Sequence, residues 1–175
     1  MDGVLAVYRR KDYKCADPKF LHLGEHYFRN LKPIEKMVET VANLDKECKK
    51  TGKGKVIILT GIHYVNDALL LEHVTDKADW LKQYLPSLDL DTQFLATTGD
   101  KGQSAIIFKR APITADDILV DDFNMNLVSW EDHDGTAVKY LNGNNNAKTF
   151  SGEKMSRNFT SDDCYDYLKG LIEDN

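Results

Sequence analysis

The run Ile118-Leu119-Val120-Asp121-Asp122 constrains the fold of this chain more than any other stretch. Three consecutive branched apolar residues predict a strand buried on both faces, as in a parallel sheet, because a half-exposed strand alternates apolar and polar positions. The carboxyl edge of such a sheet is where ligands bind. Two adjacent carboxylates at that edge repel each other, which favours a bound cation, and oxygen ligands favour Mg²⁺ over zinc. The alternative is that Asp121 and Asp122 only cap a helix that begins near Asn124.

Length and composition predict one globular unit. The chain has 175 residues, 42% apolar and 29% charged, which suits a single domain over residues 1–175 with one well-buried core. Its net charge of -5 argues against a nucleic-acid polymer as partner but not against a small phosphorylated ligand. The cysteines Cys15, Cys48 and Cys164 are widely separated, which is typical of reduced thiols. With no long apolar run, we expect a soluble cytoplasmic protein that is a monomer or homodimer and binds no membrane.

Two further strand ends carry groups that suit a phosphate. The apolar run Val56–Leu59 ends in Thr60-Gly61, where a hydroxyl donates and a glycine lets backbone N–H groups approach an oxyanion. The alternative is an ordinary strand-to-helix turn. A strand is also predicted over Thr92–Thr97, and Lys101 follows it on a flexible loop. There the Lys101 ammonium would be a point charge for an anionic ligand. The alternative is that Lys101 is only a solvated turn residue.

Helical spacing predicts a helix after most of these strands. We expect helices over Pro33–Lys50, Val65–Val74, Thr75–Leu85, Gln103–Lys109 and Asn124–Trp130, a further strand over Thr136–Leu141, and a last helix capped by Thr160 and Asp163. Alternating strands and helices predict an α/β fold with a doubly wound, Rossmann-like parallel sheet. The carboxyl edge of that sheet would carry Asp2, Thr60, Lys101, Asp121 and Asp122.

The order of these motifs resembles the haloacid dehalogenase superfamily of phosphatases, and most of all its cytosolic 5'(3')-deoxyribonucleotidase family. The matching segments are Met1-Asp2-Gly3-Val4-Leu5-Ala6, Leu31-Lys32-Pro33-Ile34, Leu59-Thr60-Gly61, Gly99-Asp100-Lys101 and Leu119-Val120-Asp121-Asp122. The resemblance implies a Mg²⁺-dependent phosphomonoesterase that acts on a nucleoside monophosphate through an aspartyl-phosphate. The alternatives are another small phosphorylated metabolite as substrate, or a non-catalytic relative that binds Mg²⁺ and phosphate.

The resemblance also implies a role for each matching residue. Asp2 would be the general acid and base and would lend its carbonyl oxygen to Mg²⁺. Asp121 would be a carboxylate ligand of Mg²⁺, with Asp122 in the same acidic site. Thr60 and Gly61 would hold the phosphate, and Lys101 would pair with the phosphate and the nucleophile.

One position departs from the family pattern. The family's nucleophile is the aspartate two positions before Asp2, whereas this chain starts at Met1. We expect that the native protein begins upstream and that the chain as given is inactive or nearly so. The alternative is a relative without chemistry.

The segment from about residue 8 to 30 stands where the family has a small cap over the substrate. Its aromatic residues would stack on a base or form the cap's own core. His63 and Tyr64, which follow the phosphate loop, are possible substrate contacts. His22 and His26 are one helical turn apart, but no acidic residue near them completes a zinc set, so we expect them on the surface or in the cap.

Overall fold

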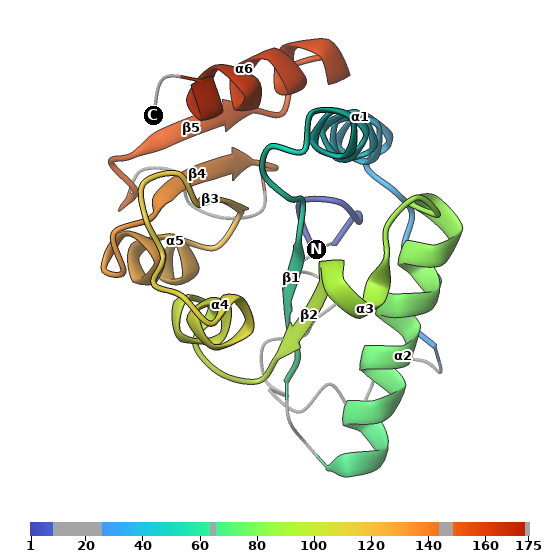
Figure 1. Cartoon of the computed structure of the whole chain (residues 1–175). Coiled ribbons are helices and arrows are strands. Elements are labelled where there is room, and N and C mark those ends of the chain that lie inside the picture. The colour runs from blue at the N-terminus through green and yellow to red at the C-terminus, as the bar shows by residue number, and fades with distance from the viewer. Residues whose placement is uncertain (9–25, 64–65, 144–148, 174–175) are drawn as a thin grey trace.

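The computed structural model describes residues 1–8, 26–63, 66–143 and 149–173. Over these ranges the chain is an α/β protein, as predicted (Figure 1). Its elements in chain order are α1 (Glu35–Thr51), β1 (Ile58–Gly61), α2 (Asp67–Tyr84), α3 (Leu90–Gln93), β2 (Phe94–Thr97), α4 (Lys101–Lys109), β3 (Ile118–Asp121), α5 (Asn124–Glu131), β4 (Thr136–Leu141), β5 (Glu153–Ser156) and α6 (Ser161–Glu173).

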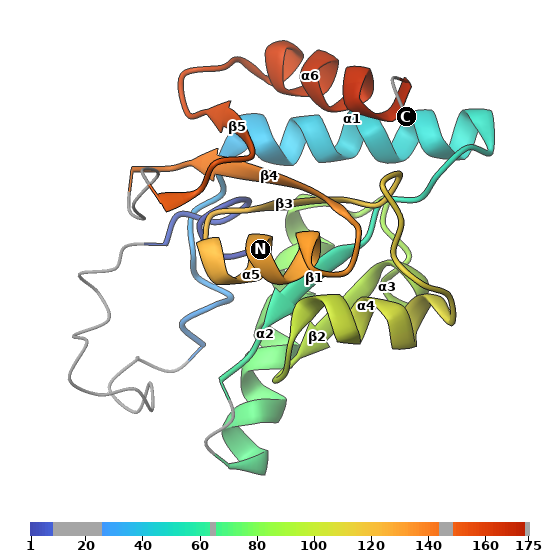
Figure 2. The same ribbon diagram turned by 90° about the vertical axis from the view of Figure 1, so that its left-hand side faces the viewer.

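The described strands form two parallel sheets. One sheet pairs β1 with β2, and the other has the order β3-β4-β5. Helices cover both faces: α1 and α6 lie together on one side of β3 and β4, and α4 and α5 lie on the other (Figure 2). Every described pairing within the two sheets is parallel, and the last residues of β1, β2 and β3, namely Gly61, Thr97 and Asp121, line the same cleft.

Two apolar clusters divide the core between the faces. Successive side chains of β3 point to opposite faces of the sheet, which explains this division. Leu119 belongs to one cluster, while Ile118 and Val120 pack against the other. The larger cluster joins α1, α2 and α6 to the sheets through residues such as Met37, Trp80 and Leu168, and the smaller one joins α4 and α5 through Ala105, Leu127 and Trp130. The strand predicted at Ile118–Asp121 is thus packed on both faces.

The amino-terminal segment belongs to the larger cluster. Met1, Val4, Leu5 and Ala6 are buried in it together with Ile58 of β1 and Val138 of β4. Gly3 turns the chain with φ of 77°, and the N–H of Ile34 donates to the carbonyl of Leu5 at 2.7 Å. This turn fixes Asp2 close to both sheets.

Several expected boundaries were wrong. The two helices predicted over Val65–Val74 and Thr75–Leu85 are one continuous helix, α2. The predicted strand Thr92–Thr97 is shorter, since Leu90–Gln93 is helical and only Phe94–Thr97 is extended. The short strand β5 was not predicted.

Other expectations hold or fall outside the described ranges. The Thr160 and Asp163 side chains each accept the other residue's backbone N–H, a capping box at the start of α6. Most of the cap expected over residues 8–30, with His22 and Cys15, lies outside the described residues, as does Tyr64. None of the helices in the described part of the chain combines the length and the apolar character needed to cross a membrane.

Candidate active site

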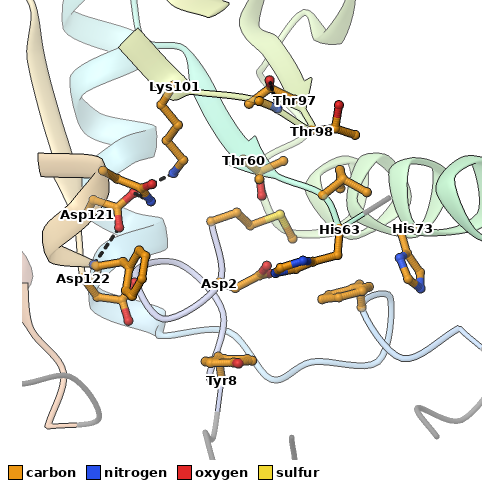
Figure 3. Close-up of a pocket in the computed structure, with 17 residues that line it drawn as sticks. Asp2, Tyr8, Thr60, His63, His73, Thr97, Thr98, Lys101, Asp121 and Asp122 are labelled. Atoms are coloured by element: carbon orange, nitrogen blue, oxygen red, sulfur yellow. Dashed lines mark hydrogen bonds and ion pairs between the residues drawn. The ribbon is translucent and has the colours of Figure 1, made fainter. Parts of the chain in front are cut away.

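The predicted site residues line one cleft at the carboxyl edge of the strands. The cleft has a volume of about 530 Å³. Figure 3 shows it with Lys101 and Asp121 on one side, His63 and His73 on the other, and Tyr8 below Asp2. Its walls include every predicted site residue that the structure describes: Asp2, Thr60, Gly61, His63, Lys101, Asp121 and Asp122.

Asp121 and Lys101 form a buried ion pair in the cleft. The Lys101 ammonium lies 2.5 Å from Asp121 Oδ2, and the Asp121 side chain also accepts from Asn126 Nδ2 at 3.0 Å and from the Phe123 N–H at 2.8 Å. Burial alone would raise the pKa of Asp121, but the Lys101 ammonium and the nearby amino group of Met1 hold it below its usual range. Asp121 is therefore ionised at neutral pH. Its bond to Phe123 supports the turn before α5, but no side chain caps that helix, so the alternative that Asp121 only caps a helix is wrong.

Lys101 is held more firmly than predicted. It is not on a flexible loop: it is the first residue of α4, whose amino end is capped by the Asp100 side chain accepting the Gln103 N–H at 2.8 Å. Its side chain is nearly buried, and the ammonium also donates to the Leu59 carbonyl at 3.3 Å. The charge of Lys101 therefore has a fixed position on one side of the cleft.

Asp122 lies against the amino-terminal turn. Its Oδ2 accepts from Asn142 Nδ2 at 2.7 Å, and a Cβ built on Gly3 would come within 2.4 Å of the same oxygen. Burial, followed by the charge of Asp121, raises the pKa of Asp122. Glycine at position 3 is therefore required both by its positive φ and by the close approach of Asp122.

Asp2 is paired with a lysine that sequence reasoning missed. The Lys77 ammonium lies 2.5 Å from Asp2 Oδ2 and donates to Thr60 Oγ1 and to the Gly61 carbonyl, each at 2.9 Å. Burial lowers the pKa of Lys77, while Asp2 opposes that shift. Because a lysine ammonium only donates, Thr60 Oγ accepts from it, and the hydroxyl hydrogen of Thr60 is left to donate into the cleft.

The second oxygen of Asp2 has no such neighbour. Asp2 Oδ1 is buried and has no hydrogen-bond partner among the described residues. A buried carboxylate oxygen without a donor carries a desolvation penalty that a proton, a cation or a ligand would remove. This oxygen is therefore a candidate for proton transfer or metal binding.

The sequence did contain a signal for Lys77. His73, Asp76 and Lys77 occupy the same helical spacing as the buried Trp80 and Leu81, so they extend the buried face of α2. Charged residues on a buried helix face require polar partners, because unpaired buried charges are costly. That pattern marks α2 as part of the site.

The cleft also contains neutral imidazoles and aromatic rings. Burial, followed by the charge of Lys77, lowers the pKa of His63, and burial also lowers the pKa of His73, so both rings are uncharged at neutral pH. Tyr8, Phe28 and Phe123 line the cleft, and Phe123 is 47% exposed. Of the aromatic residues expected to stack on a base, Tyr8 and Phe28 therefore reach the cleft.

The donor set of the cleft suits a hard cation that keeps part of its water shell. In the described part of the chain, Asp2, Asp121 and Asp122 do not bring three carboxylate oxygens within 4.8 Å of one another, so they are not a closed cage. Magnesium usually takes one or two carboxylates and retains several waters. The remaining acceptor capacity of Asp121 Oδ1 fits such an ion.

Comparison of the sequence with protein-family models and with curated proteins finds no match.

Proposed function

We propose that this chain is the core of a Mg²⁺-dependent phosphomonoesterase with a haloacid dehalogenase-like, doubly wound fold, and that its substrate is a nucleoside monophosphate. One observation carries the proposal: groups from four separate segments of the chain, Asp2, Thr60, Lys101 and the Asp121-Asp122 pair, line a single cleft at the carboxyl edge of parallel strands. This combination of acid, hydroxyl, cation and carboxylates is what phosphoryl transfer requires.

Some cleft residues would bind the phosphate oxygens, and others would bind the metal ion. Lys101 neutralises a phosphate oxygen from the amino end of α4, where the helix dipole adds positive potential. The Thr60 hydroxyl, oriented by Lys77, donates to a second phosphate oxygen. The backbone carbonyl of Asp2 and the carboxylate of Asp121 would hold Mg²⁺, which when bound offsets negative charge on the phosphoryl group.

Asp2 moves the proton in this proposal. With Oδ2 fixed by Lys77, the unpartnered Oδ1 gives its proton to the leaving alcohol oxygen as the phosphorus–oxygen bond breaks, and later takes a proton from the attacking water. The balance is phosphate monoester plus water giving alcohol plus phosphate. By the resemblance, the phosphoryl group passes through an aspartate that the family pattern has two positions before Asp2.

The size and lining of the cleft favour a nucleotide. Its volume of about 530 Å³ lies within the range of about 300–1,000 Å³ typical of small-molecule sites. Tyr8 and Phe123 line the cleft, and aromatic rings there would stack on a planar base. A nucleoside monophosphate therefore uses more of the lining than a smaller phosphate ester does.

The test is a paired assay of Mg²⁺-dependent phosphate release. One sample is the chain as given, and the other carries an added apolar strand that ends in aspartate, with that aspartate two positions before Asp2. Both are given 5'- and 3'-nucleoside monophosphates and sugar phosphates. The proposal predicts release from nucleotides by the extended form alone, and loss of release when Asp2→Asn is introduced there. Absence of release in both forms would contradict hydrolysis and favour the non-catalytic alternative.

A further inference from the structure

A second group of potential metal ligands lies outside the catalytic cleft. His26, Glu72 and Asp76 each offer a ligand atom, and these atoms lie within 4.8 Å of one another. Glu72 and Asp76 are one turn apart on α2, whereas His26 comes from the segment that leads into α1 and passes alongside α2 (Figure 1). The acidic partners of His26 thus come from 46 and 50 residues further along the chain.

Hydrogen bonds hold these three residues together. His26 Nδ1 lies 2.9 Å from Asp76 Oδ1, and the His26 backbone N–H donates to Glu72 Oε1 at 3.2 Å. Ligand atoms around a tetrahedral zinc ion at about 2.0–2.1 Å are separated by about 3.3 Å. The two atoms, now at the hydrogen-bond distance of 2.9 Å, would therefore move apart by about 0.4 Å to bind such an ion together.

The strongest independent observation is an orphaned oxygen. The Asp76 side chain is only 1% exposed and turns one oxygen toward His26, while its Oδ2 is buried without a hydrogen-bond partner among the described residues. Buried carboxylate oxygens are paired or bound to metals in nearly all proteins, because the desolvated charge is otherwise costly. The site therefore lacks a cation or donor at this oxygen.

Neighbouring cations do not meet that need. Arg29 Nε is 3.5 Å from Asp76 Oδ1, beyond good hydrogen-bond distance, while its Nη2 pairs with Asp79 at 2.5 Å. Lys77, the next residue, is committed to Asp2 on the cleft side. Asp79 is therefore paired with both Arg29 and Lys82, at 2.5 and 3.2 Å, whereas Asp76 Oδ2 has no hydrogen-bond partner among the described residues.

We propose that His26, Glu72 and Asp76 bind a divalent transition-metal ion, with Zn²⁺ as the expected occupant. One imidazole nitrogen and two carboxylates suit Zn²⁺ better than Mg²⁺, which prefers oxygen alone. Three protein ligands leave a position for water. The ion would fasten the segment at His26 to α2, next to Phe28 and His73 on the wall of the cleft. This proposal does not rest on the proposed function.

The test is calorimetric titration of the full chain with ZnCl₂ in excess MgCl₂, which occupies oxygen-only sites. The variants His26→Gln and Glu72→Gln each remove one ligand from an exposed or half-buried position, so their folding is not at risk from burial. Asp79→Asn is the matched control, because it removes a carboxylate from the same helix that is not among the three ligands. The buried Asp76→Asn is included with circular dichroism to confirm its fold.

The proposal predicts one equivalent of Zn²⁺ bound by the wild type and by Asp79→Asn, with affinity at least about tenfold weaker in His26→Gln and Glu72→Gln. Zn²⁺ should also raise the melting temperature of the wild type more than that of His26→Gln, because a ligand stabilises the folded state in proportion to how tightly it binds. Equal affinity in the wild type and both ligand variants, or no binding at one equivalent, would overturn the proposal.

Discussion

Lys77 and Asp2 are 75 residues apart in the chain, and their charged groups lie 2.5 Å apart beneath the cleft. The lysine is 1% exposed, and its other two donors are taken by Thr60 and by the Gly61 carbonyl. This one side chain thus ties α2 to the end of β1 and to the amino-terminal turn. It sets the orientation of two groups that the proposed chemistry uses.

Replacing Lys77 by methionine should destabilise the protein by about 3 kcal/mol, because it leaves the Asp2 carboxylate without its cation. Urea unfolding measures the change. The double variant Lys77→Met with Asp2→Asn should recover part of the loss, since the unpaired charge is removed as well. Lys82→Met is the control: it breaks an exposed ion pair on the same helix and should change stability by less than about 1 kcal/mol. A Lys77→Met protein as stable as the Lys82→Met protein would contradict the pairing.

Gly3→Ala tests the contact between the amino-terminal turn and Asp122. The added Cβ would face a positive φ of 77° and an oxygen at 2.4 Å. The backbone strain costs about 1–2 kcal/mol, and displacement of Asp122 adds about 1–3 kcal/mol. Gly54→Ala is the matched control, because it has φ of 71° and no atom nearer than 3.7 Å. Equal losses of stability in the two variants would show that Asp122 is not crowded by residue 3.

Asp45 should make stability depend on pH in the acidic range. Burial alone would raise its pKa, but hydrogen bonds from Lys49, Gln93 and Ser87 lower it below the ordinary value of 3.8. As pH falls, Asp45 is therefore protonated in the unfolded chain at a higher pH than in the folded chain. The stabilisation that Asp45 provides is complete above pH 3.8 and is lost as pH falls toward its folded-state pKa.

Asp45→Asn is the variant that isolates this effect. It should lower the free energy of unfolding by about 2 kcal/mol at pH 7 and by clearly less at pH values below the ordinary pKa. Chemical unfolding at a series of pH values measures the difference between the two proteins. A difference that stays constant from neutral to acidic pH would mean that Asp45 is not held in its charged form by these partners.

The sequence predicted the parts of the site that depend on strand ends. The unbroken apolar runs before Thr60 and Asp121 identify buried parallel strands, and parallel strands bring their carboxyl ends to one edge. The position of Thr60, Lys101 and Asp121 just after predicted strands was therefore enough to predict that they line one cleft.

The missed features depend on distant contacts or on weak local patterns. The bond of Lys77 to Asp2 and the approach of His26 to Glu72 and Asp76 join segments about 50 to 75 residues apart, which no local pattern records. In β5, Met155 alone is buried, so Glu153–Ser156 lacks the apolar run of an inner strand. Asp89 caps Leu90–Gln93 as a helical turn by accepting the Asp91 N–H, a signal that the strand prediction overlooked.

The most direct test of the proposed site is Mg²⁺-dependent binding of inorganic phosphate to the chain as given, followed by ³¹P NMR. Binding needs Lys101, Thr60 and the carboxylates but not a nucleophile. The proposed site predicts saturable binding that requires Mg²⁺ and that weakens by at least about tenfold in Lys101→Met, because one charge-assisted contact is lost. Lys109→Met, which breaks an ion pair with Asp117 at the other end of α4, should bind like the wild type. Phosphate binding that is absent, or is equal in Lys101→Met and the wild type, would contradict the proposed site.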